Sequence, residues 1–204
     1  MELHVQDVIT WMNKTNERLQ SNKEYLTSLD QAVGDGDHGI NMARGFNEVV
    51  QKIDGADYET VSDALKDVAM TLMSKVGGAA GPLYGTAFLK LSTSLKGKDS
   101  VDQESFKSGL EEALAGMKQR GKSDEGEKTL VDVWSPVIET FTNSFNPEDL
   151  VQTAQTAMEK TKDMKATKGR ASYLGDRSIG HLDPGSVSSF YLFESLAETV
   201  KGGE

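Results

Sequence analysis

The chain has 204 residues, of which 37% are hydrophobic and 26% charged, so it is long enough for a folded domain with a sizeable core. Its 22 Lys and Arg residues against 32 Asp and Glu residues give a formal net charge of −10, which disfavours binding to nucleic acid and to anionic membranes. Cysteine is absent, which excludes disulfides, thiolate metal sites and a cysteine nucleophile.

The sequence carries no sign of a targeting or membrane segment. No apolar run reaches the roughly 18 residues that a transmembrane helix needs, and the acidic N-terminus is unlike a signal peptide. No linker or internal repeat divides the chain. We therefore expect a single cytoplasmic domain over residues 1–204.

Apolar residues recur at helical spacing along almost the whole chain, and no useful stretch alternates with period two. Glu194 interrupts the last apolar stripe, and Pro136 predicts a bend inside the fifth. The fold is predicted to be all-α, with about eight helices. The stripes run over 5–12, 43–53, 61–76, 106–117, 130–141, 150–161 and 187–200.

Helix starts can also be read from the sequence. Thr60 is expected to cap a helix with Asp63 as its partner, and Asn146 and Asp183 each stand before a proline at the first helical position. Pro82 is expected to play the same part after Gly81. Three irregular, glycine-rich stretches remain at 77–86, 120–129 and 166–185, and such loops let a ligand approach the backbone.

The first of four candidate sites is the sequence LDQAVGDGDHG, which places Asp30, Asp35 and Asp37 within eight residues. Three converging carboxylates repel one another unless a cation neutralises them, and their oxygens suit Mg²⁺ or Ca²⁺. An EF-hand is excluded because the twelfth loop position counted from Asp35 is Phe46. The alternative is that Asp37 only caps a helix starting near His38.

The helix that follows the carboxylates gives this segment a second property. Its first N–H groups, at His38, Gly39, Ile40 and Asn41, are expected to point at the same space and to attract phosphate. Mg²⁺ bridges carboxylate and phosphate oxygens, so the two features together predict a metal-phosphate site.

The other three candidates are weaker on their own. The small residues of 77–86 suit either a ligand or close helix packing, and 120–132, with Gly121 and Leu130, suits either an aromatic base or an ordinary polar connection. The segment 168–185 concentrates cations in an acidic chain, and Arg170 and Arg177 are natural phosphate partners. For His181 we prefer a loop hydrogen bond to a role as nucleophile.

Four stretches together resemble one family, the L subunits of dihydroxyacetone kinases. They are GDGDHGINMARGF, SKVGGAAGPLYGTAF, RGK with GEKTLVDVW, and KGRASYLGDRSIGHLDPGS, in family order from the first third of the chain to its last helix. The resemblance implies a barrel of eight antiparallel helices with a nucleotide site at one end.

The resemblance also implies a set of site residues, with no catalytic side chain because transfer is metal-assisted. Asp30, Asp35 and Asp37 would ligate two Mg²⁺ ions. The nucleotide, ADP or ATP, would contact His38, Gly39, Ile40, Asn41, Gly78, Ala79, Ala80, Gly121, Thr129, Leu130, Arg170, Asp183, Pro184 and Gly185.

By the same resemblance, a chain without a K domain would use bound ADP as a retained cofactor. The phosphotransfer-system protein DhaM would rephosphorylate it, and the phosphoryl group would pass to dihydroxyacetone on the K subunit, DhaK; a homodimer is compatible with this. Two alternatives stay open: an ATP-consuming kinase subunit for a small hydroxylated substrate, and a non-enzymatic ADP-binding regulatory module.

Overall fold

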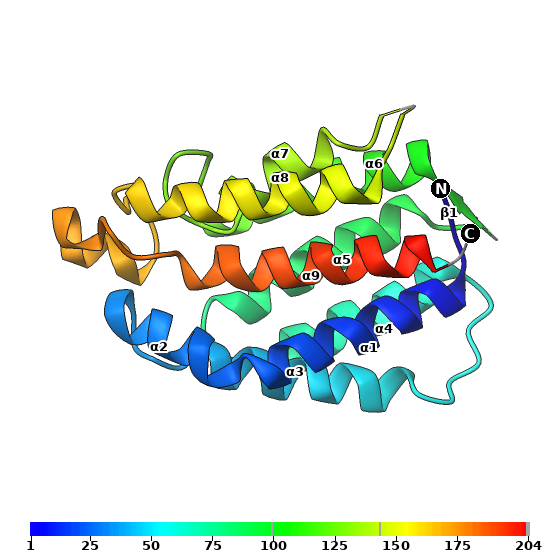
Figure 1. The fold of residues 1–204 in the computed structure, drawn as a ribbon. Coiled ribbons are helices and arrows are strands. Elements are labelled where there is room, and N and C mark those ends of the chain that lie inside the picture. The colour runs from blue at the N-terminus through cyan, green and yellow to red at the C-terminus, as the bar shows by residue number, and fades with distance from the viewer. Residues whose placement is uncertain (99, 143, 203–204) are drawn as a thin grey trace.

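The computed structural model describes residues 1–98, 100–142 and 144–202, and the expected domain end at 204 lies outside them. The fold is an all-α barrel of antiparallel helices, as predicted (Figure 1). A two-stranded antiparallel pairing of β1 with β2 is the one sheet in the described part. The elements are β1 (Glu2–Leu3), α1 (Val5–Ser21), α2 (Lys23–Val33), α3 (His38–Ile53), α4 (Val61–Lys75), α5 (Ala80–Ser94), β2 (Val101–Asp102), α6 (Gln103–Gly121), α7 (Val131–Ile138), α8 (Pro147–Lys160), the 3₁₀ helices η1 (Thr161–Asp163) and η2 (Arg170–Ser178), and α9 (Pro184–Lys201).

The helices run along one long axis and reverse direction from one to the next, from α3 onward (Figure 1). The last helix, α9, lies between α1 and α8 and so closes the barrel (Figure 1). Strand β1 and the C-terminal end of α9 lie at one end of the barrel (Figure 1). The opposite end holds α2, η2 and the starts of α3, α5, α7 and α9.

The predicted caps are present in the structure. Thr60 Oγ1 accepts the N–H of Asp63, and the side chains of Asn146 and Asp183 accept N–H groups at the starts of α8 and α9. Each cap satisfies an N–H that has no acceptor within its own helix. These helix starts therefore follow from interactions within three residues along the chain.

Two helix boundaries differ from the prediction. Helix α5 begins at Ala80, so most of 77–86 is helical and Pro82 is the third helical residue rather than the first. A proline is tolerated throughout the first turn because its missing N–H would have no partner there. Helix α7 ends at Ile138 instead of reaching Phe141, because Pro136 donates no hydrogen bond and tighter turns follow it.

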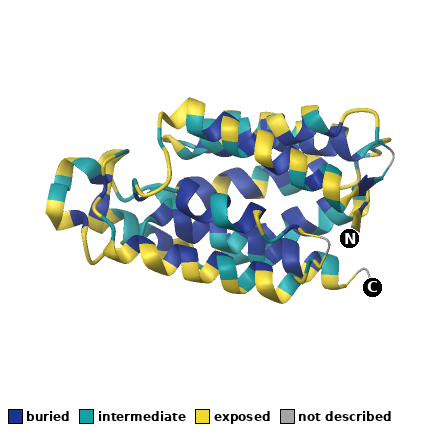
Figure 2. Cartoon of the chain, turned by 90° about the horizontal axis from the view of Figure 1, so that it is seen from above, coloured by how far each residue is buried: buried dark blue, intermediate teal, exposed yellow. Residues whose placement is uncertain are grey.

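The core is filled by the inward faces of the helices, as the dark blue interior of Figure 2 shows. Trp11 is buried against Phe88 and Phe106, with ring centroids 5.5 Å and 6.2 Å away, and its indole N–H donates to the carbonyl of Leu192. Apolar burial of this extent is the main force holding α1, α5, α6 and α9 together.

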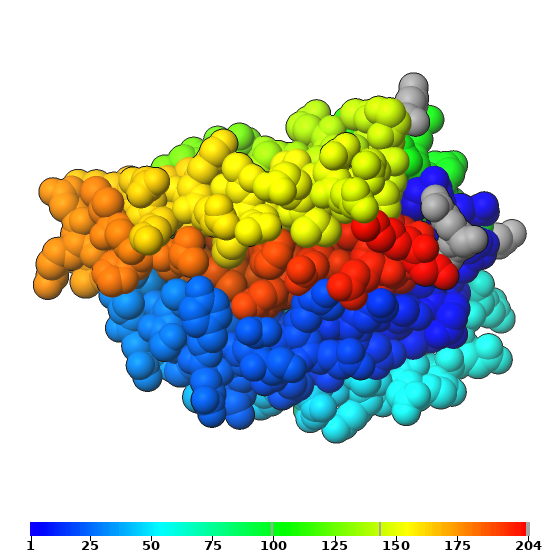
Figure 3. Space-filling model, in the orientation of Figure 1, coloured from blue at the N-terminus to red at the C-terminus, as the bar shows by residue number. Residues whose placement is uncertain are grey.

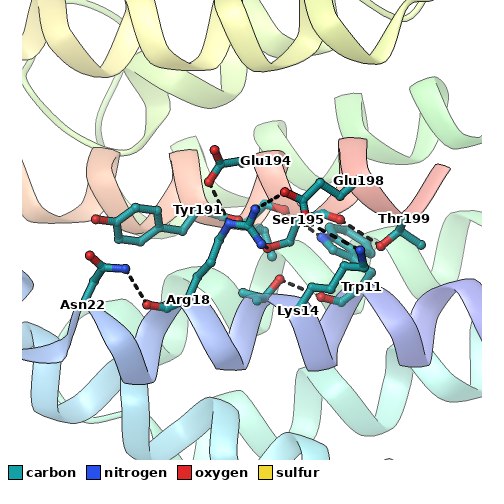
Figure 4. A network of polar contacts seen from close by, with 11 residues as sticks. Trp11, Lys14, Arg18, Asn22, Tyr191, Glu194, Ser195, Glu198 and Thr199 are labelled. Carbon is teal, nitrogen blue, oxygen red and sulfur yellow. Dashed lines mark hydrogen bonds and ion pairs between the residues drawn. The ribbon is translucent and has the colours of Figure 1, made fainter. Parts of the chain in front are cut away.

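Glu194, the acidic residue that interrupts the last apolar stripe, is held by an arginine from α1. Arg18 Nε lies 2.7 Å from Glu194 Oε2, and its guanidinium also pairs with Glu198 (Figure 4). The arginine fork joins α1 to α9 with two carboxylates one turn apart. No helix in the described part of the chain has the length and hydropathy needed to cross a membrane.

Candidate functional site

A cavity opens at the end of the barrel opposite the chain termini. Its volume is about 830 Å³ when the open solvent at its mouth is included. Most of the predicted site residues line it. The lining residues are Asp30, Val33, Gly34, Asp35, Asp37, His38, Gly77, Gly78, Ala79, Ala80, Leu83, Tyr84, Lys128, Thr129, Leu130, Lys168, Gly169, Arg170, Ala171, Asp183, Pro184 and Gly185.

Four helices present their N-termini to this cavity. The lining includes the first residue or the cap of α3, α5, α7 and α9, namely His38, Ala80, Leu130 and Pro184. Each helix N-terminus carries a partial positive charge, so this end of an acidic protein favours an anion. Because successive helices run in opposite directions from α3 onward, every second helix begins at this end of the barrel.

The four N-termini are not equivalent. Those of α7 and α9 are capped within the chain, by the hydroxyl of Thr129 on the N–H of Val131 and by Asp183 on that of Ser186. Thr129 lies one residue before Leu130, the N-cap residue of α7. No hydrogen-bond acceptor among the described residues meets the N–H groups of Gly39 and Ile40 or of Ala80 and Gly81, so α3 and α5 keep donors for a ligand.

The three aspartates of the first candidate site converge. Asp30 comes from the end of α2, Asp35 from the following turn and Asp37 from the start of α3, and one oxygen of each lies within 4.8 Å of the others. Oxygens on opposite sides of one Mg²⁺ are about 4.2 Å apart, so this donor set fits Mg²⁺ in both chemistry and spacing.

Asp30 is held in place by the backbone of the next helix. Its Oδ2 accepts the N–H groups of Asp37 at 2.9 Å and His38 at 3.1 Å, which leaves Oδ1 for another partner. A Cβ at Gly34 would overlap this carboxylate, so glycine is required there. Asp37 occupies the N-cap position, but its side chain accepts no N–H of α3, which removes capping as the reason for an aspartate at that position.

Two of the four N–H groups expected to face a phosphate are already used. The N–H of His38 donates to Asp30, and that of Asn41 donates to the carbonyl of Asp37. Gly39 fits closely against the carbonyl of Lys23 on α2, where a Cβ would overlap that backbone. Gly39, Ile40 and Asn41 are absent from the cavity lining, so their predicted ligand contacts find less support than those of His38.

His38 is partly buried at the start of α3. Burial lowers its pKa, although the nearby carboxylates of Asp30 and Asp37 act in the opposite direction. Its Nε2 lies 2.9 Å from the hydroxyl of Ser188, which in turn lies 2.8 Å from the buried hydroxyl of Tyr84. This chain of hydrogen bonds fixes the start of α3 against α5 and α9.

The glycines of 77–86 serve both of the uses that the sequence left open. Gly78 has a φ of +66° and lines the cavity, with no heavy atom closer than 4.0 Å to the position of a Cβ. Gly81 and Gly85 face the backbone of α4, where a Cβ would overlap the carbonyl of Val76 in the first case and crowd that of Ala69 in the second. The small residues therefore combine a ligand-facing start with close helix packing.

The far wall of the cavity is apolar. Leu83 and Leu130 line it together with Ala171, which packs on Val33 as part of a small apolar cluster separate from the main core. Gly121, the last residue of α6, does not line the cavity, but the space above its Cα is bounded by the side chain of Leu83. Its predicted contact with a base is thus not reproduced directly.

Arg170 lies at the mouth and Asp183 at the base of the cavity. Arg170 Nη2 lies 2.8 Å from Asp35 Oδ2, whereas Arg177 is exposed and does not line the cavity. Asp183 is partly buried, and this burial raises its pKa to about 6 against the opposing effect of hydrogen bonds from Ser186. The carbonyl of His181 accepts a hydrogen bond, in keeping with its expected role as a loop residue.

Residues 32–198 match the family model described as the DAK2 domain. The chain is 50% identical over 192 residues to the ADP-binding subunit DhaL of a PEP-dependent dihydroxyacetone kinase from Listeria innocua, and the alignment covers 94% of each chain. The chain belongs to the DAK2 domain family.

Two further relatives of this DAK2 domain carry similar names. The ADP-binding subunit DhaL of the PTS-dependent kinase from Lactococcus lactis is 48% identical, over 97% of this chain and 99% of its own length. The DhaL subunit of the PEP-dependent kinase from Escherichia coli is 38% identical, over 98% and 100%. This DAK2 domain is therefore related over nearly its full length to kinase subunits of the predicted family.

Solved structures share the fold of this DAK2 domain. The dihydroxyacetone kinase of C. freundii in its native form matches with a TM-score of 0.78 at 23% identity, over 94% of this chain and 34% of the solved one. The same kinase in complex with AMP-PNP and Mg²⁺ matches with a TM-score of 0.76 at 24% identity, over 94% and 33%. The barrel found here is thus a known architecture.

Two cavity-lining residues of this DAK2 domain were missed by sequence reasoning. Tyr84 reads as one more apolar residue of a helix, yet its hydroxyl is bonded to Ser188 and Ser189. Lys128 reads as a solvated charge in a polar turn, yet it is 1% exposed. The polar neighbours of both come from elements far away in the chain, so no local pattern could reveal them.

Proposed function

We propose that this chain is the nucleotide-binding subunit of a phosphotransferase-system-dependent dihydroxyacetone kinase. In this proposal bound ADP is rephosphorylated by DhaM, and the phosphoryl group is passed to dihydroxyacetone held by the K subunit, DhaK. The full-length similarity to subunits named for ADP binding supports it. The observation that carries it is the cluster of Asp30, Asp35 and Asp37 beside the open N-termini of α3 and α5 in one cavity.

The polar part of the cavity lining suits the phosphates of a nucleotide, and the apolar part suits its base. The three aspartates would hold two Mg²⁺ ions, whose charge neutralises phosphate oxygens when they are bound. The N–H of Ala80, a lining residue, has no acceptor among the described residues and is free to meet a phosphate, and Arg170 adds a cation to the lining. Leu83 and Leu130 provide an apolar wall of the kind that adenine needs.

In the proposed mechanism, no side chain of this subunit accepts or donates a proton during the transfer. His38 is partly buried with its Nε2 engaged by Ser188, which suits a positioning part rather than an acid or base. Transfer of a phosphoryl group depends mainly on alignment and charge neutralisation. A group that accepts the hydroxyl proton of dihydroxyacetone is then expected on DhaK.

The nucleotide itself provides the test. The protein is purified without added nucleotide and denatured, and the released nucleotide is identified; we expect ADP. Labelled ADP should exchange slowly compared with turnover, and phosphorylated DhaM, but not modest ATP, should sustain phosphorylation of dihydroxyacetone with DhaK. Rapid ADP–ATP exchange with full activity from ATP alone would overturn the retained-cofactor proposal in favour of an ATP-consuming subunit.

A variant pair separates the enzyme from a regulatory ADP-binding module. Asp35→Asn removes one carboxylate of the cluster, whereas Asp176→Asn removes an exposed carboxylate of η2 that pairs with Lys165 on the surface. In a reconstituted complex the first variant should lose kinase activity and the second should keep it. Full activity of both would contradict the proposed role of the cluster.

A further inference from the structure

The ammonium group of Lys128 is buried within a cage of backbone carbonyls. Its Nζ lies 2.7 Å from the carbonyl oxygen of Thr161, 3.1 Å from that of Met164, 2.8 Å from that of Ser178 and 2.5 Å from that of His181, so one of its N–H groups is shared between two oxygens. An ammonium group has three N–H donors and no acceptor, so a set of carbonyls suits its charged form. A neutral amine would turn a lone pair toward one of these oxygens.

These four carbonyls bracket one continuous segment, residues 161–181. Two come from the start of the segment around η1, one from the last residue of η2 and one from the turn that leads to α9. Between them, Lys168, Gly169 and Arg170 line the cavity mouth. In Figure 3 this orange segment lies against the light blue residues of α2, at the end of the barrel that carries the cavity.

Lys128 also belongs to the opposite wall of the same cavity. It directly precedes Thr129 and Leu130, and all three line the space. Its φ is +61°, a backbone conformation that a side chain rarely adopts and that persists where the surroundings impose it. One residue therefore connects the wall at the start of α7 to the segment over the mouth.

Other contacts also tie segment 161–181 to the barrel: Arg170 pairs with Asp35, Lys168 lies 3.9 Å from a carboxylate oxygen of Glu127, and Ala166 and Ala171 pack with Val33. Thr167 N–H donates to the carbonyl of Glu127, and Asp183 N–H donates to the hydroxyl of Thr161. The internal bonds of the segment, such as Gly180 N–H to Lys162, shape it without anchoring it. Burial lowers the pKa of Lys128, and the nearby carboxylates of Asp183 and Asp163 act in the opposite direction.

We propose that Lys128 is a positioning residue that clamps segment 161–181 over the cavity and thereby sets the rate at which a bound nucleotide escapes. The clamp is a charged donor shared among carbonyls, so it depends on the charge of the side chain and not on its bulk alone. The inference rests on the proposed function for the identity of the ligand, a nucleotide. The contacts between Lys128 and segment 161–181 do not depend on that function.

A chemical substitution tests the charge directly. The chain has no cysteine, so Lys128→Cys introduces a single thiol that can be alkylated in the unfolded protein before refolding. Bromoethylamine restores an ammonium group at the reach of lysine, and 1-bromopropane adds a neutral side chain of the same length. Lys128→Met supplies a genetically encoded neutral form. Lys122→Met is the matched control, because Lys122 also has a positive φ, +50°, but is exposed.

Two measurements are made on each form: hydrogen–deuterium exchange of segment 161–181 without nucleotide, and dissociation of labelled ADP in the presence of Mg²⁺. We expect the propyl and Lys128→Met forms to exchange and to release ADP about tenfold faster or more, and the aminoethyl form and Lys122→Met to behave like the parent. If the propyl form does not refold, the comparison of Lys128→Met with the parent protein decides whether the charge is needed.

Three outcomes would overturn the clamp: equal exchange in the charged and neutral forms, faster exchange with unchanged release of ADP, or Lys128→Met behaving like the parent. A parent protein that binds no ADP, with the exchange difference intact, would refute the proposed function and the part of the inference that concerns nucleotide escape. The exchange experiment thus separates failure of the clamp from failure of the function.

Discussion

Arg170 and Asp35 form an ion pair across the mouth of the cavity, with 2.8 Å between Nη2 and Oδ2. One partner belongs to segment 161–181 and the other to the carboxylate cluster. The same carboxylate is therefore offered both to a cation of the protein and, in our proposal, to Mg²⁺.

The first prediction concerns this competition. Arg170→Ala should let Mg²⁺ alone bind up to about fivefold more tightly, because an exposed ion pair of this kind is worth about 1 kcal/mol or less. The same variant should release Mg²⁺-bound ADP faster, since a cation near the phosphates is lost. Magnesium titration calorimetry and labelled ADP release measure the two effects. Arg177→Ala is the control, and weaker binding of Mg²⁺ alone to Arg170→Ala would contradict the competition.

The second prediction concerns Asp37. Mg²⁺ and ADP together should raise the melting temperature well beyond either alone, because each neutralises the repulsion of the other. Asp37→Ala should abolish this synergy. Since the Asp37 side chain accepts no N–H of α3, the variant without ligand should differ from the parent by no more than about 0.5 kcal/mol in unfolding free energy.

Thermal unfolding with Mg²⁺, with ADP and with both checks this prediction, and Asp176→Ala serves as the exposed control. A loss of about 1 kcal/mol in the ligand-free Asp37→Ala protein would show that Asp37 is a helix cap after all. Equal stabilisation by ADP with excess chelator would contradict a shared site.

The third prediction concerns the pH dependence of stability. Burial raises the pKa of Asp183 to about 6 in the folded protein, above the value of about 3.9 expected when unfolded. The folded state therefore holds the proton more tightly, and this contribution to stability is complete below pH 4 and is lost as the pH rises through 6. A two-unit shift corresponds to a contribution on the order of 3 kcal/mol.

Asp183→Asn keeps a capping oxygen for the N–H of Ser186 but cannot titrate. Relative to this variant, the parent should lose on the order of 3 kcal/mol of unfolding free energy between pH 4 and pH 7. Urea unfolding of both proteins without ligand across this range gives the comparison. A parent whose stability relative to Asp183→Asn rises with pH would show that the carboxylate is stabilised rather than destabilised by its surroundings.

The fourth prediction concerns helix packing. Alanine usually stabilises a helix relative to glycine by about 0.5–1 kcal/mol, but at Gly81 a Cβ would overlap the carbonyl of Val76. Gly81→Ala should therefore destabilise the protein by about 1–3 kcal/mol, the usual range for overpacking. Gly116→Ala in α6 is the comparison variant, since its Cβ would meet side-chain atoms, Lys90 Cγ at 2.9 Å and Thr86 Cγ2 at 3.1 Å, rather than backbone. Chemical denaturation that ranks the two variants equally would contradict the close packing of α4 and α5.

The sequence by itself determined the helices, several of their starts and the carboxylate turn. The apolar spacing of α4, the cap of Thr60 and the glycines between Asp30 and Asp37 act within a few residues along the chain. Such interactions depend little on the rest of the fold, because their partners are close neighbours in any compact state. The boundaries of α5 and α7 were misread where a proline lies in a helix and its effect depends on the turn it occupies.

The tertiary structure alone decided what those pieces do together. The reversal of helix direction brings the N-termini of α3, α5, α7 and α9 to one cavity, and closure of the barrel places carbonyls 33 to 53 residues away around the ammonium of Lys128. The sequence shows Lys128 as one charge among many. Its burial follows only when long-range packing removes water and supplies the oxygens that replace it, because the free energy of a buried charge depends on partners that no local pattern specifies.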